Sequence, residues 1–177
     1  MPGRKLEWKW IFDAVTMLTV VLGVTFGAAE LRELRESQES QAMMQLYQTL
    51  QSPDHVRGTN YIGQLPATLS ADSILALSIT GPYAAEMRQV TLTFEAIGVM
   101  VYRGDVPIEW VDELFHYSIV SSWNKLKPSV MLRRQRLNYP AVLEWYQWLA
   151  ERLMERENRQ DAMPAYEAYR DWKPPRD

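Results

Sequence analysis

The sequence predicts an all-α protein in which one N-terminal transmembrane helix continues into a bundle of four or five helices. Three observations predict this fold class. A long apolar stretch lies near the start of the chain. Apolar residues in later segments recur three and four positions apart, which is the spacing of one helix face. We find no segment with a convincing alternation of period two, so no strand is expected.

Composition narrows the possible functions of the 177-residue chain. A net charge of −3 argues against a general nucleic-acid binder, which normally carries a basic face. The absence of cysteine excludes disulfides, thiolate metal sites and a cysteine nucleophile. Seven tryptophans and nine tyrosines are a heavy aromatic content, and such residues concentrate at protein interfaces and membrane boundaries as well as in cores.

The expected transmembrane helix lies at residues 10–29, where Asp13 is the one charged residue. Twenty helical residues reach about 30 Å, the thickness of the hydrocarbon layer. Trp8 and Trp10 stand where interfacial anchors belong, and a basic N-terminal flank precedes them. A signal peptide is the alternative, because small residues at 27–29 resemble a cleavage site. Asp13 and the tryptophans favour the transmembrane helix, while its orientation in the membrane is left open.

Polar and small residues within this helix indicate which contacts it makes in the membrane. We expect Asp13 to lie near the interface, reaching back toward Lys9, and a partner subunit's polar group is the alternative contact. Gly23 and Gly27 form a GxxxG pair, which is consistent with close helix packing. They belong to a stripe of small residues at helical spacing that comprises Thr16, Thr19, Gly23 and Gly27.

The helical domain is expected at residues 30–160, after the 1–29 anchor and before a tail at 161–177. The first helix should run on to about Ser52, because no breaker occurs before Pro53. Prolines and glycines then permit two short helices, near 54–64 and 71–79.

Three longer segments complete the expected bundle. One begins at Pro82 and ends at Gly104, which suits the residue after a helix C-terminus. The next follows Pro107, and Lys127-Pro128 should kink or break it. Asn138-Tyr139-Pro140 should begin the last long helix.

No catalytic residue, metal site or cofactor is predicted. His55 and His116 are the two histidines, far apart in sequence, and each is expected at the surface or in packing. Glu95 lies on an apolar helix face, where a carboxylate needs a partner. We expect a core salt bridge with an arginine from 133–136, and a catalytic acid is the alternative.

Two clusters are candidate contact sites. Arg133, Arg134 and Arg136 suit either anionic lipid headgroups or nearby acidic side chains, and the sequence does not choose between these. Tyr166, Tyr169 and Trp172 place aromatic rings at every third residue of the tail, which favours contact with another protein.

The assembled pattern resembles a family of uncharacterised bacterial proteins with a domain of unknown function. The resemblance rests on LTFEAIGVMVYRGDVP (92–107), SSWNKLKPSV (121–130) and EWYQWLAERL (144–153), together with the apolar N-terminal stretch and MMQLYQTLQSP (43–53). It implies one N-terminal membrane helix and a helical domain, and it supplies no activity, cofactor or catalytic residue.

The expected function is that of a single-pass membrane-anchored interaction module, an accessory or assembly subunit of a larger membrane complex. Respiratory and photosynthetic assemblies are natural candidates. Membrane lipid and other membrane subunits are the expected partners, without nucleic acid, at the bacterial inner membrane. The alternative is a membrane-tethered enzyme or signalling module with an interhelical pocket near Glu95, His116 and Arg133–Arg136. A third interpretation is a peripheral protein that binds anionic lipid through its arginines.

Overall fold

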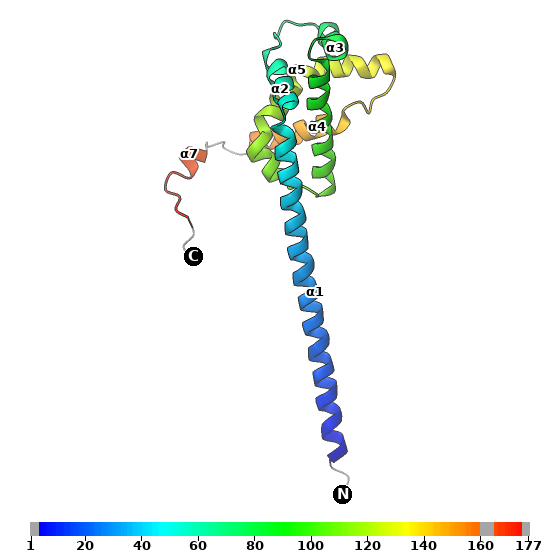
Figure 1. Ribbon diagram of the computed structural model, residues 1–177, viewed down its shortest axis with the longest axis vertical. Coiled ribbons are helices and arrows are strands. Elements are labelled where there is room, and N and C mark those ends of the chain that lie inside the picture. Colours follow the sequence, from blue (N-terminus) through cyan, green and yellow to red (C-terminus); the bar gives the residue numbers. More distant parts are fainter. Residues whose placement is uncertain (1–3, 160–164, 175–177) are drawn as a thin grey trace. The chain divides into compact units, whose positions relative to one another are not determined.

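The computed structural model describes residues 4–159 and 165–174 and confirms the all-α fold. No strand occurs among these residues (Figure 1). The chain divides into two compact units, Met1–Met44 and Gln45–Asp177, which are described separately. The helices are α1 (Arg4–Leu50), α2 (Pro53–Gln64), α3 (Ala71–Thr80), α4 (Ala84–Arg103), α5 (Ile108–Leu137), α6 (Glu144–Arg159) and α7 (Ala165–Ala168).

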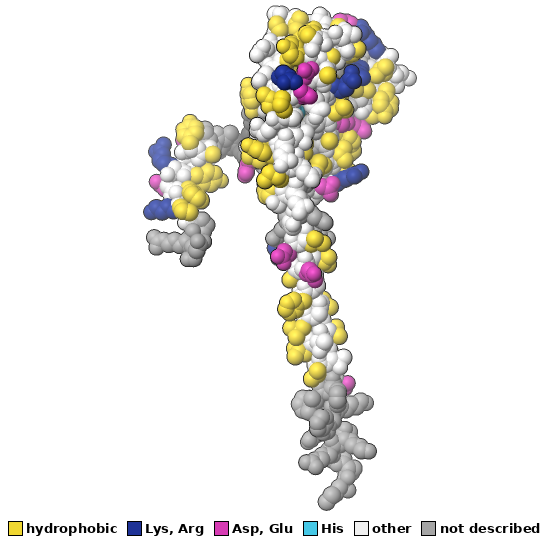
Figure 2. Space-filling view, viewed as in Figure 1, with side chains coloured by type: hydrophobic (Ala, Val, Ile, Leu, Met, Phe, Trp, Pro, Cys, Tyr) yellow, Lys and Arg dark blue, Asp and Glu magenta, His cyan; other side chains and the backbone are white. Residues whose placement is uncertain are grey.

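The first unit contains a helical segment that is long and apolar enough to span a membrane. It covers Asp13–Leu34, with a mean hydropathy of 1.8, and none of it is buried among the described residues. Hydrophobic side chains follow one another along this part of α1 (Figure 2). The hydroxyls of Thr19 and Thr25 each donate to a carbonyl of their own helix at 2.9 Å. These side chains therefore bring no unsatisfied donor into an apolar environment.

The second unit has one hydrophobic core, formed by α2 to α6. Helix α4 packs against α2 and α6, while α5 packs against α2, α3 and α6. Three aromatic rings fill the centre, because Phe94 and Trp123 both contact Tyr146, with ring centroids 5.3 and 5.1 Å apart. The largest fully buried side chains are Trp123, Tyr146, Phe94, Ile62, Met87, Ile97, Ile119, Leu149, Leu153, Val90, Val106 and Val111.

Capping residues set most helix boundaries where the sequence predicts them. Ser52 and Ser70 cap α2 and α3, accepting hydrogen bonds from backbone amides three residues later. Gly104 ends α4 with φ of +78°, a left-handed conformation that glycine adopts without a steric cost. Asn138 ends α5 in the same region, with φ of +48°.

A lysine from another helix caps the C-terminus of α2. Lys125, on α5, donates through Nζ to the carbonyl of Leu65 at 2.8 Å and to that of Gly63. Neither carbonyl has a hydrogen-bond partner within α2, so a side chain 62 and 60 residues later in the sequence satisfies them.

The predicted break at Lys127-Pro128 and the predicted start of the last long helix at residues 138–140 are wrong. Helix α5 runs unbroken across Pro128, which is exposed, so solvent can hydrate the carbonyl that loses its partner. Burial of Leu126 and Val130 on the opposite side holds the two halves of α5 together. The last long helix begins at Glu144, four residues after Pro140, because Leu143 has φ of +53° and is not helical.

Candidate functional site

The predicted anchor residues lie on α1, and the structure leaves the described ones uncovered. Asp13 is exposed at the start of the apolar segment. A Cβ added at Gly23 or Gly27 would meet no atom within 4 Å, so this face of the helix is open. The side chains of Trp8 and Trp10 lie outside the described residues.

Glu95 is bound to backbone amides and not to the arginine that the sequence suggested. Its Oε2 accepts a hydrogen bond from the backbone N–H of Tyr146 at 2.7 Å, and the N–H of Trp145 also contributes. Helix α6 begins at Glu144, so these amides belong to its first turn and lack partners within the helix. Glu95 thus caps α6 from α4, and the expected core salt bridge is wrong.

The surroundings of Glu95 act on its protonation in opposite directions. Burial raises the pKa of its carboxyl group, while the amides of Tyr146 and Trp145 oppose that rise. The charge of Arg134 also lowers the pKa, with a smaller effect. These contacts assign Glu95 a structural role in holding α6.

His116 lies in an ion-pair network elsewhere on α5. Its Nδ1 is 2.7 Å from Oδ1 of Asp112. The other oxygen of Asp112 accepts from Nε of Arg156 at 2.8 Å, and Arg156 also lies 3.2 Å from Glu109. This network joins α5 to α6 and does not include Glu95.

His55 is buried beside a cavity of about 230 Å³. The side chain is 4 % exposed, and its ring meets Phe94 edge-on at 5.4 Å. Its Nδ1 and the hydroxyl of Thr59 are buried and have no hydrogen-bond partner within the described part of the chain. Burial lowers the pKa of His55 from its ordinary value of 6.5.

The three predicted contact arginines have different environments. Arg134 donates to the carbonyls of Val142 and Leu143 and to the side chain of Gln147, so it holds the connection before α6. Arg136 pairs with Asp72 on α3. Arg133 lines a cavity that contains neither Glu95 nor His116.

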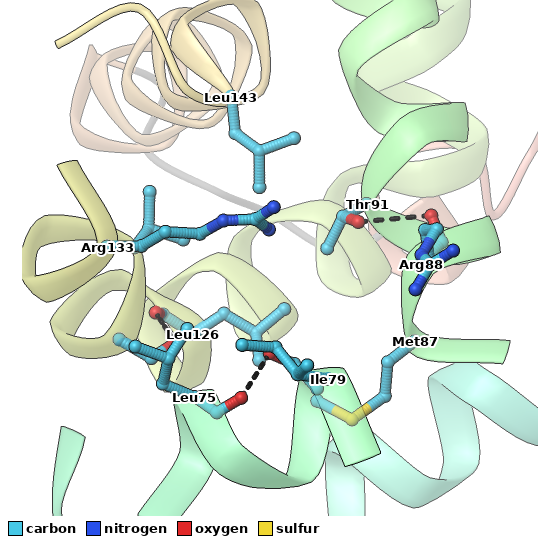
Figure 3. Close-up of a pocket in the computed structure, with 11 residues that line it drawn as sticks. Leu75, Ile79, Met87, Arg88, Thr91, Leu126, Arg133 and Leu143 are labelled. Atoms are coloured by element: carbon cyan, nitrogen blue, oxygen red, sulfur yellow. Dashed lines mark hydrogen bonds between the residues drawn. The ribbon is translucent and has the colours of Figure 1, made fainter. Parts of the chain in front are cut away.

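That cavity, of about 230 Å³, lies between α3, α4 and α5 and reaches the start of α6. Arg133 extends from α5 into it, and Arg88 stands beyond Thr91 on α4 (Figure 3). Among the described residues neither guanidinium forms an ion pair, and no carboxylate lines the cavity. Its apolar lining consists of Leu75, Ile79, Met87, Leu126, Val130 and Leu143.

The hydroxyl groups of this cavity already donate within their own helices. Ser78 donates to Leu75 at 2.8 Å, and Ser129 donates to Leu126 at 2.7 Å. The two arginines therefore provide its side-chain donors. Sequence reasoning missed Arg88, because only the tertiary structure brings it to the cavity that Arg133 also lines. The signal available was a charged residue directly after Met87, on the border of the apolar α4 stripe.

The described residues of the C-terminal tail leave the predicted aromatic contacts uncovered. Tyr166, Tyr169 and Trp172 are each at least 65 % exposed; Tyr166 lies within the short helix α7, and Tyr169 directly follows it. Among the residues that the structure describes, no group of three or more His, Asp or Glu is placed to hold a metal ion.

These features define a class: an all-helical protein with one N-terminal helix that is long and apolar enough to span a membrane. The chain belongs to the family described as Domain of unknown function (DUF4760), whose model matches residues 17–153. The match includes most of the apolar segment and ends before the tail. No curated protein and no solved structure matches the chain.

Proposed function

We propose that this chain is a single-pass membrane-anchored helical interaction module, an accessory or assembly subunit of a membrane protein complex. The observation that carries the proposal is the uncovered segment Asp13–Leu34. Twenty-two helical residues extend about 33 Å, enough to cross a hydrocarbon layer. None of this segment is buried among the described residues, and an exposed apolar surface of this length is the kind that lipid or another protein covers.

The helical domain supports an interaction role over an enzymatic one. Glu95 and Arg134 are engaged in contacts that hold α6 and the connection before it, His116 pairs with Asp112 within α5, and no cavity found among the described residues is lined by these three side chains. The alternative of a tethered enzyme with a pocket between these groups therefore receives no support from the geometry. Exposed aromatic rings at Tyr166, Tyr169 and Trp172 provide the kind of side chain that is enriched at interfaces.

The proposed location is the bacterial inner membrane, and two measurements test the anchor. We expect the full chain to stay in the membrane pellet after alkaline carbonate extraction. A Val20→Arg variant, with a charge in the middle of the apolar segment, should be released or should fail to insert, since such a charge costs about 2.5–3.5 kcal/mol. Release of the unaltered chain under the same treatment would refute the anchor.

Photocrosslinking tests whether the anchor packs against a partner subunit. A photoreactive residue at Gly23 should give a discrete protein adduct in intact membranes, because Gly23 and Gly27 allow close helix approach. Val21, two residues earlier and on the opposite helix face, is the matched control and should label lipid. A lone monomer in mild detergent, without an adduct from either position, would contradict the subunit role.

A further inference from the structure

We propose that the cavity between α3, α4 and α5 binds a small amphiphilic anion, with a carboxylate or phosphate head and an apolar body. The inference rests on two arginines, Arg88 and Arg133, which line one largely apolar cavity. The inference goes beyond the proposed anchoring function and does not depend on it.

The charged side of the cavity selects the head of the ligand. Arginine is always ionised, and its planar group donates in a fork that matches carboxylate and phosphate oxygens. Two other arginines of this domain form ion pairs: Arg136 pairs with Asp72, and Arg156 pairs with Asp112. Arg88 and Arg133 are exposed and, like the exposed Arg103, form no ion pair among the described residues; unlike Arg103, both line the cavity, so their donors can reach a ligand bound there.

The apolar side selects the body of the ligand. Leu75, Met87, Leu126 and Val130 are each at most 5 % exposed and form a buried apolar wall. Ile79, at 53 % exposed, and Leu143 stand nearer the mouth. Arg133 extends between Leu143 and this wall, so a head bound to its guanidinium would place an attached chain against aliphatic carbons (Figure 3).

The volume limits the size of the ligand. At about 30 Å³ for each water-sized group, about 230 Å³ corresponds to roughly eight such groups. Cavities for drug-sized ligands are usually larger, about 300–1,000 Å³. A carboxylate head with a chain of about five or six carbons fills this volume, and the end of a longer chain, such as that of octanoate, octyl phosphate or a lipid, extends beyond the cavity.

Chemical footprinting of the full chain tests the site without altering it. The protein is placed in phosphatidylcholine nanodiscs, and its arginines are modified with phenylglyoxal, with and without octanoate or octyl phosphate. We expect either amphiphile to protect Arg88 and Arg133, while Arg103, an exposed arginine at the end of α4, reacts as before. Equal protection by octan-1-ol, octylammonium or inorganic phosphate alone would overturn the inference, because each lacks one of the two features.

Variants and lipid composition complete the test. Arg133→Gln and Arg88→Gln should each weaken octanoate binding about tenfold or more by calorimetry, and Arg103→Gln should leave it unchanged. Unchanged binding in both pocket variants would refute the site. If the arginines are protected only when the nanodisc contains phosphatidic acid, and not by octanoate or octyl phosphate, the source of the anion is a membrane lipid. Protection by the soluble amphiphiles identifies a soluble source, and absence of protection in all arms overturns the inference.

Discussion

The carboxylate of Glu95 on α4 accepts a hydrogen bond from the backbone N–H of Tyr146, 51 residues later, at 2.7 Å. Helix α6 lacks a local capping side chain, because Leu143 precedes its first residue. A residue from a neighbouring helix supplies the oxygen that a serine or aspartate would otherwise provide. The formation of the first turn of α6 therefore depends on the packing of α6 against α4.

Removal of this cap should destabilise the helical domain. We expect Glu95→Ala to lower the free energy of unfolding by about 1–2 kcal/mol, because two amides of α6 lose their acceptor. Glu95→Gln retains an acceptor oxygen and should cost less than Glu95→Ala. Urea unfolding of the full chain in mild detergent measures both, with the exposed Glu113→Gln as control. Equal stability of Glu95→Ala and the parent chain would contradict the capping role.

Gly98 permits the close approach that brings α6 within reach of Glu95. A Cβ at this position would lie 2.4 Å from the carbonyl oxygen of Trp145, so helix backbones must separate to admit it. We expect Gly98→Ala to cost about 2 kcal/mol or more, although alanine favours helix formation. Gly63→Ala is the matched control, because its Cβ meets nothing within 4 Å, and it should be neutral or stabilising by about 0.5–1 kcal/mol. Thermal unfolding followed by circular dichroism distinguishes the two, and similar changes would refute the steric argument.

A buried pair of hydroxyls links α5 to α6 at the centre of the core. Oγ of Ser122 and the hydroxyl of Tyr146 are 2.6 Å apart, and burial raises the pKa of Tyr146. Ser122→Ala and Tyr146→Phe should each cost about 1 kcal/mol, and the double variant should cost less than their sum. A double-mutant cycle of unfolding free energies measures the coupling. Simple additivity would show that this hydrogen bond contributes nothing to stability.

Local signals explain which parts of the fold the sequence predicts. Gly104 ends α4 because its own backbone adopts positive φ, and Ser52 and Ser70 cap the helices that directly follow them. Apolar spacing identifies Val90, Phe94 and Ile97 as core residues, since helix geometry alone puts them on one face.

Contacts between distant residues explain what the sequence does not predict. The start of α6 depends on Glu95 and on the positive φ of Leu143, which no capping pattern around residue 140 indicates. The unbroken α5 depends on tertiary burial around Pro128, which overrides the local preference to break. Likewise, the cavity is lined by Arg88 and Arg133 from two helices; the basic cluster indicates Arg133 from the sequence, but nothing in its own segment indicates Arg88.

Because His55 is buried, we expect its contribution to the stability of the domain to fall as the solution becomes acidic. Burial lowers the pKa of this side chain below its ordinary value of 6.5, so the folded chain holds it neutral where the unfolded chain takes up a proton. At His55 the unfolded state then binds more protons, and the contribution of this residue to the free energy of unfolding decreases as pH falls from about 7.5 toward 5.5, by at most about 1.4 kcal/mol per pH unit. His55→Gln should reduce this slope, while His116→Gln, at the other histidine of the chain, provides the comparison. Urea unfolding of the full chain at several pH values measures the slopes, and an unchanged slope in His55→Gln would show that this histidine is not the group responsible.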